Sequence, residues 1–280
     1  MVQEALLEEF KFKRETRSRL TVLKLGGSAI TRKGIFKTAD LDAIDRLAKE
    51  IADAGVARLI VVHGGGSFGH PVAKKHKIKD GYTEESQLVG FSETHQAMLE
   101  LNKLVLDALI NCNIAAVPVT ASSCIVSKAG RIQLFFDCSL GMMLEKGFVP
   151  LLFGDTILDE DIGFTIVSGD QLVAALAIKF NAGKVILGVD VDGLYVTDPK
   201  TNPSAELIAH INLQELKSII GNIEESKVTD VTGGMLGKVS ELMPVTEAGI
   251  PILMTNAGKE DNIRKALIGE KVVGTLVDRE

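Results

Sequence analysis

The sequence has no tryptophan, two tyrosines and three cysteines among its 280 residues. Cys112, Cys124 and Cys138 form no CxxC pair, which argues against a disulfide framework or a zinc site and fits a reducing cytoplasm. No apolar run approaches the roughly 18 residues that span a bilayer, so we expect no membrane segment. Residues 1–19 are charged throughout and lack the apolar core of a signal peptide. We interpret them as an N-terminal extension, either an amphipathic helix or a loose arm, and assign them no function.

An excess of positive charge is also absent, because the formal net charge is −6. Without a global basic field, nucleic acid is not an expected partner. The hydrophobic fraction of 46% and the charged fraction of 24% are ordinary for a globular protein that buries a sizeable core.

Apolar runs and amphipathic stretches alternate along the chain from residue 20 onward, with no linker rich in proline or serine. This alternation predicts an open three-layer α/β/α sandwich with a mostly parallel central sheet. We expect one domain over 20–280, with an N-terminal lobe over about 20–180 and a C-terminal lobe over about 181–280. Two hairpins, near Ala129-Gly130 and Asp161-Gly163, are expected as antiparallel additions at a sheet edge. Strands are predicted at 20–25, 58–62, 115–119, 148–153, 184–189 and 251–254, and helices at 39–54, 92–109, 171–180 and 236–248.

The segment "VVHGGGSFGHP", Val61 to Pro71, is predicted to be a glycine loop that follows a short strand. Ligands of open α/β sheets bind beyond the carboxyl ends of the strands. Glycine lets backbone N–H groups approach an anion closely, and lysines and aspartates recur at the other predicted strand ends. The pattern indicates a polyphosphate site in which His70 contacts a phosphate of the substrate. His63 is expected to be structural, and His76 and His95 are expected to be solvated or on helix surfaces.

Each of these features also has an ordinary structural interpretation. Gly26-Gly27 could form a tight turn, and Asp155 and Asp170 could be caps. "TGGMLGKV" lacks the first glycine and the final serine or threonine of a P-loop, and "GGGSFG" alone is weak evidence for a dinucleotide site. Only their joint occurrence at predicted strand ends favours a phosphate site.

Five motifs occur in a recognisable order: "KLGGS", "HGGG", "GD", "DVDGLY…DP" and "TGGMLGK". In order and spacing they resemble the amino acid kinase superfamily, from about Leu20 to the C-terminus. Within it, "HGGGSFGHP" and "AITRKG" are similar to the isopentenyl phosphate kinases, and the related fosfomycin kinases share the histidine. The resemblance implies a Mg²⁺-dependent enzyme that transfers the γ-phosphoryl group of ATP to isopentenyl phosphate in isoprenoid biosynthesis. It also implies a homodimer, a substrate lobe at the N-terminal side and a nucleotide lobe at the C-terminal side.

The resemblance also implies roles for individual residues. Lys24 would contact the transferring phosphoryl group, and Lys33 would stabilise the transition state. His70 would hydrogen-bond the substrate phosphate, and Asp170 would orient the lysines. No residue is implied as a metal ligand. Substrate contacts are implied at Gly65, His70 and Gly169, and nucleotide contacts at Lys24, Leu25, Gly26, Gly27, Ser28, Gly66, Asp190, Gly234 and Lys238.

Two details of the pattern stay open. The family pattern is expected to read "SGDD", whereas this sequence has "SGDQ" with Gln171. An acceptor tail needs an apolar wall, for which Phe91, Met98 and Leu101 are candidates, although all three are equally interpretable as ordinary core.

Phosphoryl transfer depends on positioning and on cations more than on covalent help. The cations expected here are Lys24, Lys33, Lys238, Mg²⁺ and a protonated His70. A phosphate acceptor has a second pKa of about 6 and needs no strong general base, in keeping with the lack of an Asp–His pair in the motifs. Two alternatives remain: a fosfomycin or phosphonate kinase of the same fold, and a non-catalytic nucleotide-binding or storage protein.

Overall fold

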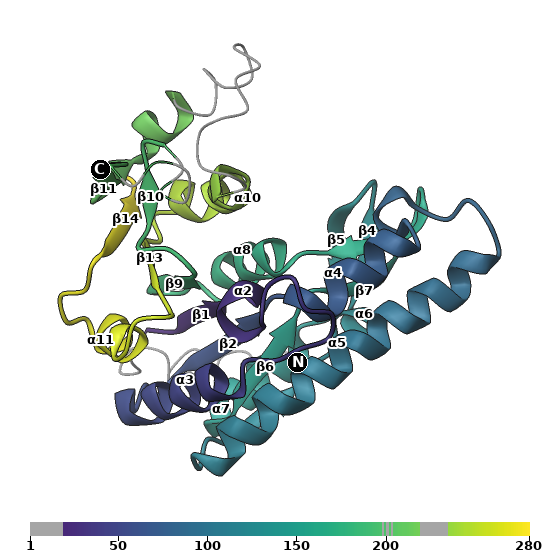
Figure 1. Ribbon diagram of the computed structural model, residues 1–280, viewed down its shortest axis with the longest axis horizontal. Helices are drawn as coiled ribbons and strands as arrows, with labels where there is room; N and C mark the ends of the chain where they lie inside the picture. Colours follow the sequence, from purple (N-terminus) through teal and green to yellow (C-terminus); the bar gives the residue numbers. More distant parts are fainter. Residues whose placement is uncertain (1–18, 198, 200–201, 203, 219–234) are drawn as a thin grey trace, which may run out of the picture.

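The computed structural model describes residues 19–197, 199, 202, 204–218 and 235–280. Residues 1–18 and Gly234, both of which carry sequence predictions, lie outside the described residues. The main feature is an eight-stranded sheet in which every neighbouring pair is parallel except β13 with β14 (Figure 1). Its strands in spatial order are β12 (His210–Asn212), β14 (Gly274–Asp278), β13 (Ile252–Asn256), β9 (Lys184–Val189), β1 (Thr21–Leu25), β2 (Leu59–His63), β6 (Val149–Phe153) and β3 (Ala116–Pro118).

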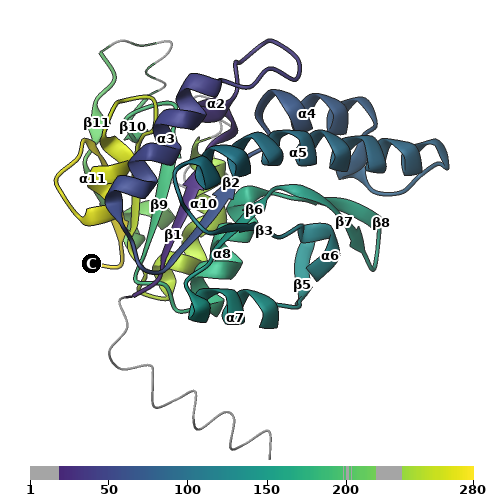
Figure 2. The same ribbon diagram turned by 90° about the horizontal axis from the view of Figure 1, so that it is seen from below.

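Helices cover both faces of this sheet, as Figure 2 shows. This confirms the predicted three-layer architecture. No helix in the described part of the chain is both long and apolar enough to cross a membrane. One face carries α2 (Gly27–Ile30), α3 (Leu41–Ala54), α4 (Gly66–Lys75), α5 (Ser86–Asn111) and α11 (Asn262–Ile268), and the other carries α7 (Cys138–Lys146), α8 (Gly169–Lys179) and α10 (Met235–Glu247).

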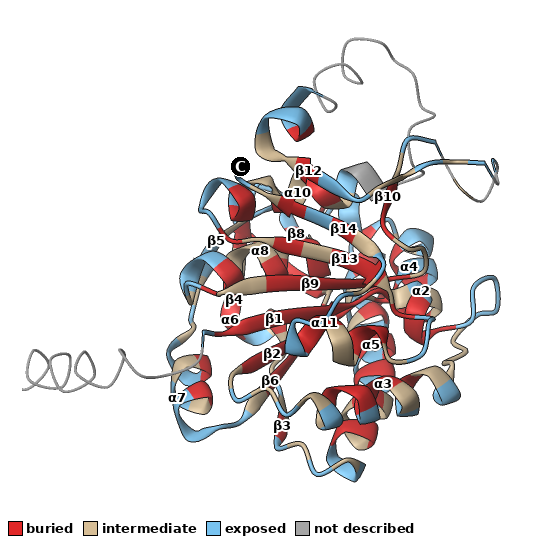
Figure 3. Ribbon diagram, turned by 90° about the vertical axis from the view of Figure 1, so that its left-hand side faces the viewer, coloured by how far each residue is buried: buried red, intermediate tan, exposed pale blue. Residues whose placement is uncertain are grey.

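The central strands are buried on both faces, which explains why they read as continuous apolar runs (Figure 3). Successive side chains of a strand point to opposite faces of the sheet. Thus Val22 packs in the hydrophobic cluster with α8, whereas Leu23 packs in the cluster with α3 and α5. This alternation decides which layer each functional side chain of a strand can reach.

Both predicted hairpins are present, but their predicted place at a sheet edge is wrong. They pair with each other as a separate four-stranded sheet, formed by β5 (Arg131–Phe135), β4 (Ile125–Lys128), β7 (Asp155–Asp159) and β8 (Gly163–Val167). Asp159 joins them, because its carboxylate accepts hydrogen bonds from the Ser127 hydroxyl and from backbone N–H groups of both turns. These bonds lower the pKa of Asp159 to about 2 against the opposing effect of burial.

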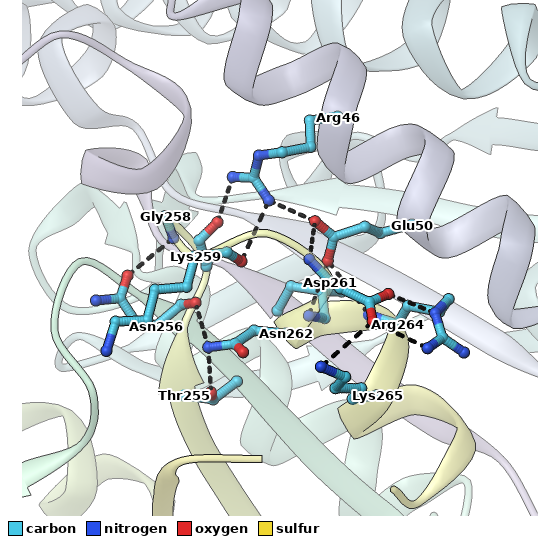
Figure 4. Close-up of polar contacts among 12 residues, drawn as sticks. Arg46, Glu50, Thr255, Asn256, Gly258, Lys259, Asp261, Asn262, Arg264 and Lys265 are labelled. Atoms are coloured by element: carbon cyan, nitrogen blue, oxygen red, sulfur yellow. Dashed lines mark hydrogen bonds and ion pairs between the residues drawn. The ribbon is translucent and has the colours of Figure 1, made fainter. Parts of the chain in front are cut away.

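A buried carboxylate fastens the C-terminal part of the chain to α3 (Figure 4). Glu50 accepts backbone N–H bonds from Asp261 and Ile263 at 3.0 and 2.9 Å, at the start of α11. Arg46, one turn earlier on α3, bonds to Glu50 and donates to the carbonyl oxygen of Ala257. The segment that follows β13 is therefore held at the carboxyl end of the sheet.

Candidate active site

Lys24 and Asp170 form a buried ion pair, with the lysine Nζ 2.5 Å from a carboxylate oxygen. Lys24 shares its strand face with Val22, so it points toward α8. Ser168 is the N-cap of α8, since its hydroxyl accepts the backbone N–H of Gln171 at 3.1 Å. That start places Asp170 in the first turn, facing Lys24. The interpretation of Asp170 as a simple N-cap is wrong because Ser168 has that role.

Lys238 of α10 completes a group of three charges, with its Nζ 3.6 Å from the second carboxylate oxygen of Asp170. Burial lowers the pKa of Lys24 to about 8, Asp170 opposes that shift, and Lys238 adds to it. One carboxylate thus holds two lysines close together at the carboxyl end of β1. The ammonium groups of Lys24 and Lys238 can therefore donate charge-assisted hydrogen bonds to a phosphate bound between them.

The loops that follow β1 and β2 pack directly backbone to backbone. A Cβ on Gly27 would lie 2.2 Å from the backbone nitrogen of Gly66, which leaves no room for a side chain. Gly66 itself has a φ of +47°, a conformation in which only glycine is unstrained. These two glycines let two backbone loops meet beside Lys24, as the predicted anion cradle requires.

The predicted glycine loop is shorter than expected, because helix α4 begins at Gly66 and includes Pro71. Proline has no N–H to give to the carbonyl four residues earlier, which belongs to Ser67. That carbonyl accepts the backbone N–H of Lys37 at 3.0 Å instead. Because Pro71 leaves the Ser67 carbonyl without a partner inside the helix, that carbonyl can bind the segment that carries Lys33.

His70 lies on α4 beside this cluster. A Cβ on Gly65 would lie 3.1 Å from Cδ2 of its ring. Burial lowers the pKa of His70, and the charges of Lys238 and Lys24 lower it further. These effects favour a neutral His70 ring in the free protein, and a protonated His70 in the complex stays a prediction. A neutral imidazole can still donate one hydrogen bond to a phosphate oxygen.

One stripe of helix α5 faces the glycine loop and carries residues that no local motif marks. Asn102 accepts a bond from the buried His63 ring at 3.2 Å, and His63 stacks on Phe153, so its predicted structural role is confirmed. Met98 is buried, and its sulfur packs against Gly65 and Gly69. The spacing 95, 98, 102 is that of one helical face.

His95, on the same stripe, donates from Nδ1 to the two carboxylate oxygens of Asp155 at 2.9 and 3.0 Å. His95 lies on a helix as expected, but its ring is partly buried and paired with a carboxylate. The quoted motifs contain no Asp–His pair, and this pair joins Asp155 of the "GD" motif to a residue outside them. The two residues are 60 positions apart, so no local motif joins them. Their signal was the position of Asp155 directly after a predicted strand.

Other predicted residues are placed less decisively. Lys33 is exposed, and no hydrogen bond or ion pair joins it to another described residue, so its role stays a prediction. The Leu25 side chain is buried in the core, while Ser28 is exposed on the short helix α2 that follows. Asp190 follows β9 at the same edge of the sheet. Gln171 donates from its side chain to the carbonyl of Gly130 at 3.3 Å, which links α8 to the β4–β5 turn.

Gly169, a predicted substrate contact, packs on Lys24: a Cβ there would lie 3.1 Å from Cε of the lysine. Of the candidate tail residues, Leu101 belongs to the core cluster under α3, whereas Phe91 is half-buried and meets the Phe164 ring with centroids 5.5 Å apart. Leu101 is thus ordinary core, and Phe91 and Met98 remain candidates.

Comparison with known proteins agrees with the family that the motifs predicted. The profile of the amino acid kinase family matches residues 19–256. The chain belongs to the amino acid kinase family. Isopentenyl phosphate kinase of Methanothermobacter thermautotrophicus is 41% identical over 92% of this chain and 98% of its own length. The enzyme of that name from Methanocaldococcus jannaschii is 36% identical over the same shares.

Solved structures agree with this assignment. A crystal structure of isopentenyl phosphate kinase superposes with a TM-score of 0.81 at 38% identity, covering 92% of this chain and 99% of the other. A substrate complex of an isopentenyl phosphate kinase superposes with a TM-score of 0.76 at 28% identity. The chain is therefore a kinase of this family, as the motifs predicted, and the geometry around Lys24 is that of its candidate active site.

Proposed function

We propose that this enzyme transfers the γ-phosphoryl group of ATP to isopentenyl phosphate and forms isopentenyl diphosphate. The observation that carries the proposal is the combination of Lys24, Asp170 and Lys238 with the His70 ring on helix α4. The lysines supply positive charge for the transferring group, and His70 supplies a neutral donor for a phosphate that the acceptor already bears. Relatives that match nearly the whole chain have the same name as the proposed activity.

The mechanism requires mutual approach of two anions, so the site must offset their repulsion. Lys24 and Lys238 share one carboxylate, so the pair retains net positive charge when both lysines are protonated. We assign Lys24 to the transferring phosphoryl group, because it is buried and fixed. Lys33 on its exposed segment is assigned to the same group in the complex. The acceptor phosphate, with a second pKa of about 6, attacks without a strong base at neutral pH.

Magnesium belongs to this proposal as part of the nucleotide. Among the residues that the structure describes, no group of three or more histidine, cysteine or acidic side chains is placed to hold a metal ion. Asp170, the acidic residue of the cluster, has each of its oxygens beside a lysine. Mg²⁺ is typically bound through one or two carboxylates together with substrate phosphates. We therefore expect the substrate to be the Mg–ATP complex, with the ion coordinated chiefly by the nucleotide.

The deciding experiment measures ADP release from Mg–ATP with isopentenyl, dimethylallyl and geranyl phosphates, fosfomycin, uridine monophosphate and glutamate. Strong turnover with isopentenyl phosphate supports the proposal. Turnover confined to fosfomycin or glutamate would keep the fold and overturn the acceptor, and binding of ATP without turnover would favour a storage protein.

His70→Ala and His70→Gln test the selection of phosphate. His70→Ala should lower kcat/KM for isopentenyl phosphate by about a hundredfold, in line with the loss of a donor to a charged group, and His70→Gln should recover part of it. Unchanged activity in His70→Ala would refute the assignment. The homodimer that the resemblance implies is part of the same proposal, and light scattering of the purified protein tests it.

A further inference from the structure

The His95–Asp155 pair is the buried titratable group that the proposed chemistry leaves unused. Asp155 is 1% exposed and begins β7, directly after Gly154. Its carboxylate accepts from His95 and from the backbone N–H of Thr156 at 2.8 Å. A buried carboxylate is costly unless it is bonded to a partner, and the His95 ring supplies the cationic partner.

Each member of the pair touches one half of the active site through its neighbours. On the Asp155 side, Gly154 packs against the start of α8, since a Cβ there would lie 3.2 Å from the backbone nitrogen of Gly169. Gly169 in turn packs on Lys24. The pair is thus anchored to the half of the site that holds the lysine pair.

On the His95 side, the connection runs along α5. Met98 lies three residues further along the same face, and its sulfur packs against Gly65 and Gly69. The His70 ring lies against that same Gly65. Any shift of α5 relative to β7 would therefore move the contact surface on which His70 rests.

We propose that the His95–Asp155 pair is a positioning device for the acceptor: it locks α5 to β7 and so fixes His70 at the correct distance from the Lys24–Asp170 pair. The inference rests on the proposed function, because it assumes that His70 binds the acceptor. It assigns His95 no contact with substrate, only control of the residue that makes that contact.

The charge state of the pair follows from its surroundings. The bond to Asp155 raises the pKa of His95. From α6 (Ala121–Cys124), the Cys124 thiol stands beside the same carboxylate and stays neutral, with a pKa of about 11. At the end of α4, Lys75 and the C-cap residue His76 are paired with Glu93, on the other side of α5. His70 titrates instead in the field of Lys24 and Lys238.

Because the pKa of His95 is raised in the folded protein, the pair is fully charged below about pH 6.5, its ordinary value. The stabilisation that the charged His95–Asp155 pair contributes is lost as the pH rises through the raised pKa of His95. Acceptor KM should therefore increase across that range. In Asp155→Asn, which keeps the shape of the side chain and removes the charge, the same increase should occur at lower pH.

Three substitutions of one residue test the proposal, with steady-state KM for acceptor and for ATP measured separately. An asparagine amide nitrogen occupies the place of Nδ1, whereas a glutamine amide extends one methylene further. We expect His95→Ala and His95→Gln to raise acceptor KM about tenfold, because misplacing a positioned group by about 1 Å can cost up to about a hundredfold. His95→Asn should recover most of that loss, and ATP KM should stay within twofold throughout.

Two results would overturn the inference: His95→Asn no better than His95→Gln, or ATP KM rising by the same factor as acceptor KM. If His95→Ala does not fold, the asparagine and glutamine variants carry the comparison. The His95 pKa, followed by NMR, should fall in Asp155→Asn, because the bond to the Asp155 carboxylate is what raises it. An unchanged pKa also contradicts the pair. If the wild type uses another phosphate acceptor, the proposed function fails and the same series, run with that acceptor, still decides the inference.

Discussion

Ser67, in the first turn of α4, donates its backbone N–H to the hydroxyl of Thr31, directly after α2, over 3.0 Å. The same Thr31 hydroxyl donates a hydrogen bond to the carbonyl of Gly27 at 2.7 Å. The Ser67 side chain also exchanges bonds with both backbone groups of Thr38. A single serine thus ties the two ends of segment 31–38, which carries Lys33, to the helix that bears His70.

Ser67→Ala should loosen the Thr38 end of segment 31–38, because it removes the two hydroxyl bonds to Thr38 and keeps the backbone bonds to Thr31 and Lys37. We expect kcat to fall up to about tenfold, because Lys33 acts from that segment. The test is a double-mutant cycle with Lys33→Ala, measured as kcat at saturating substrates. If Ser67 acts through Lys33, the second substitution costs little once the first is made. Full additivity of the two losses would disconnect Ser67 from Lys33. Ser92→Ala, at an exposed serine of α5, is the matched control and should behave like the wild type.

The Lys24 pKa of about 8 predicts an alkaline limit to activity. Protonated Lys24 is the form that attracts a phosphate, so kcat/KM for ATP should fall as pH rises through about 8. The Asp170 charge raises that pKa, so Asp170→Asn should move the limit to lower pH in addition to lowering the rate. Profiles of kcat/KM from pH 6 to 10 report the free enzyme and measure both effects. An identical alkaline limit in the two proteins would show that another group sets it.

Glu50→Gln should destabilise the fold, because three backbone N–H groups at the start of α11 and the Arg46 guanidinium depend on its carboxylate. An amide keeps one acceptor oxygen and turns an NH₂ group toward those donors. We expect a loss of about 1–3 kcal/mol in the free energy of unfolding, measured by urea denaturation. Glu270→Gln, at an exposed glutamate after α11, should change it by less than about 0.5 kcal/mol. Equal effects at the two positions would argue against the anchoring role of Glu50.

The fold could be predicted from the sequence because its signals are local. The strand at Lys184–Val189 was predicted to the residue, and α3 to within two residues, since apolar runs and periodicity are short-range features. The predicted place of the hairpins failed because it depends on Asp159, whose partners come from both turns. The pairing of the two hairpins depends on tertiary contacts, which the hydrophobic periodicity of the sequence does not predict.

The residues of the site also separate into those marked by local sequence motifs and those defined by contacts between distant residues. Glycines, lysines and His70 were recognisable because they cluster in short motifs at strand ends. Ser67, Asn102 and the His95–Asp155 pair were not recognised, because each acts on a residue at least 29 positions away. Pro71 illustrates the difference. Its position after "SFGH" is visible in the sequence. Its consequence is that the Ser67 carbonyl has no partner within α4 and accepts the backbone N–H of Lys37, and this can be seen only in the fold.

The three cysteines offer a probe of the charge on Asp155. Cys124 is buried, and burial together with the Asp155 carboxylate raises its pKa to about 11, whereas Cys138 is exposed. At pH 8 roughly one Cys124 thiol in a thousand is a thiolate, so iodoacetamide should label Cys138 first. Peptide mass spectrometry of the native protein measures both rates. In Asp155→Asn the labelling of Cys124 should accelerate, since the opposing charge is removed while the burial stays. Unchanged labelling in a variant that remains folded would mean that Asp155 carries no charge in the native protein, which would also remove the electrostatic part of its hold on His95.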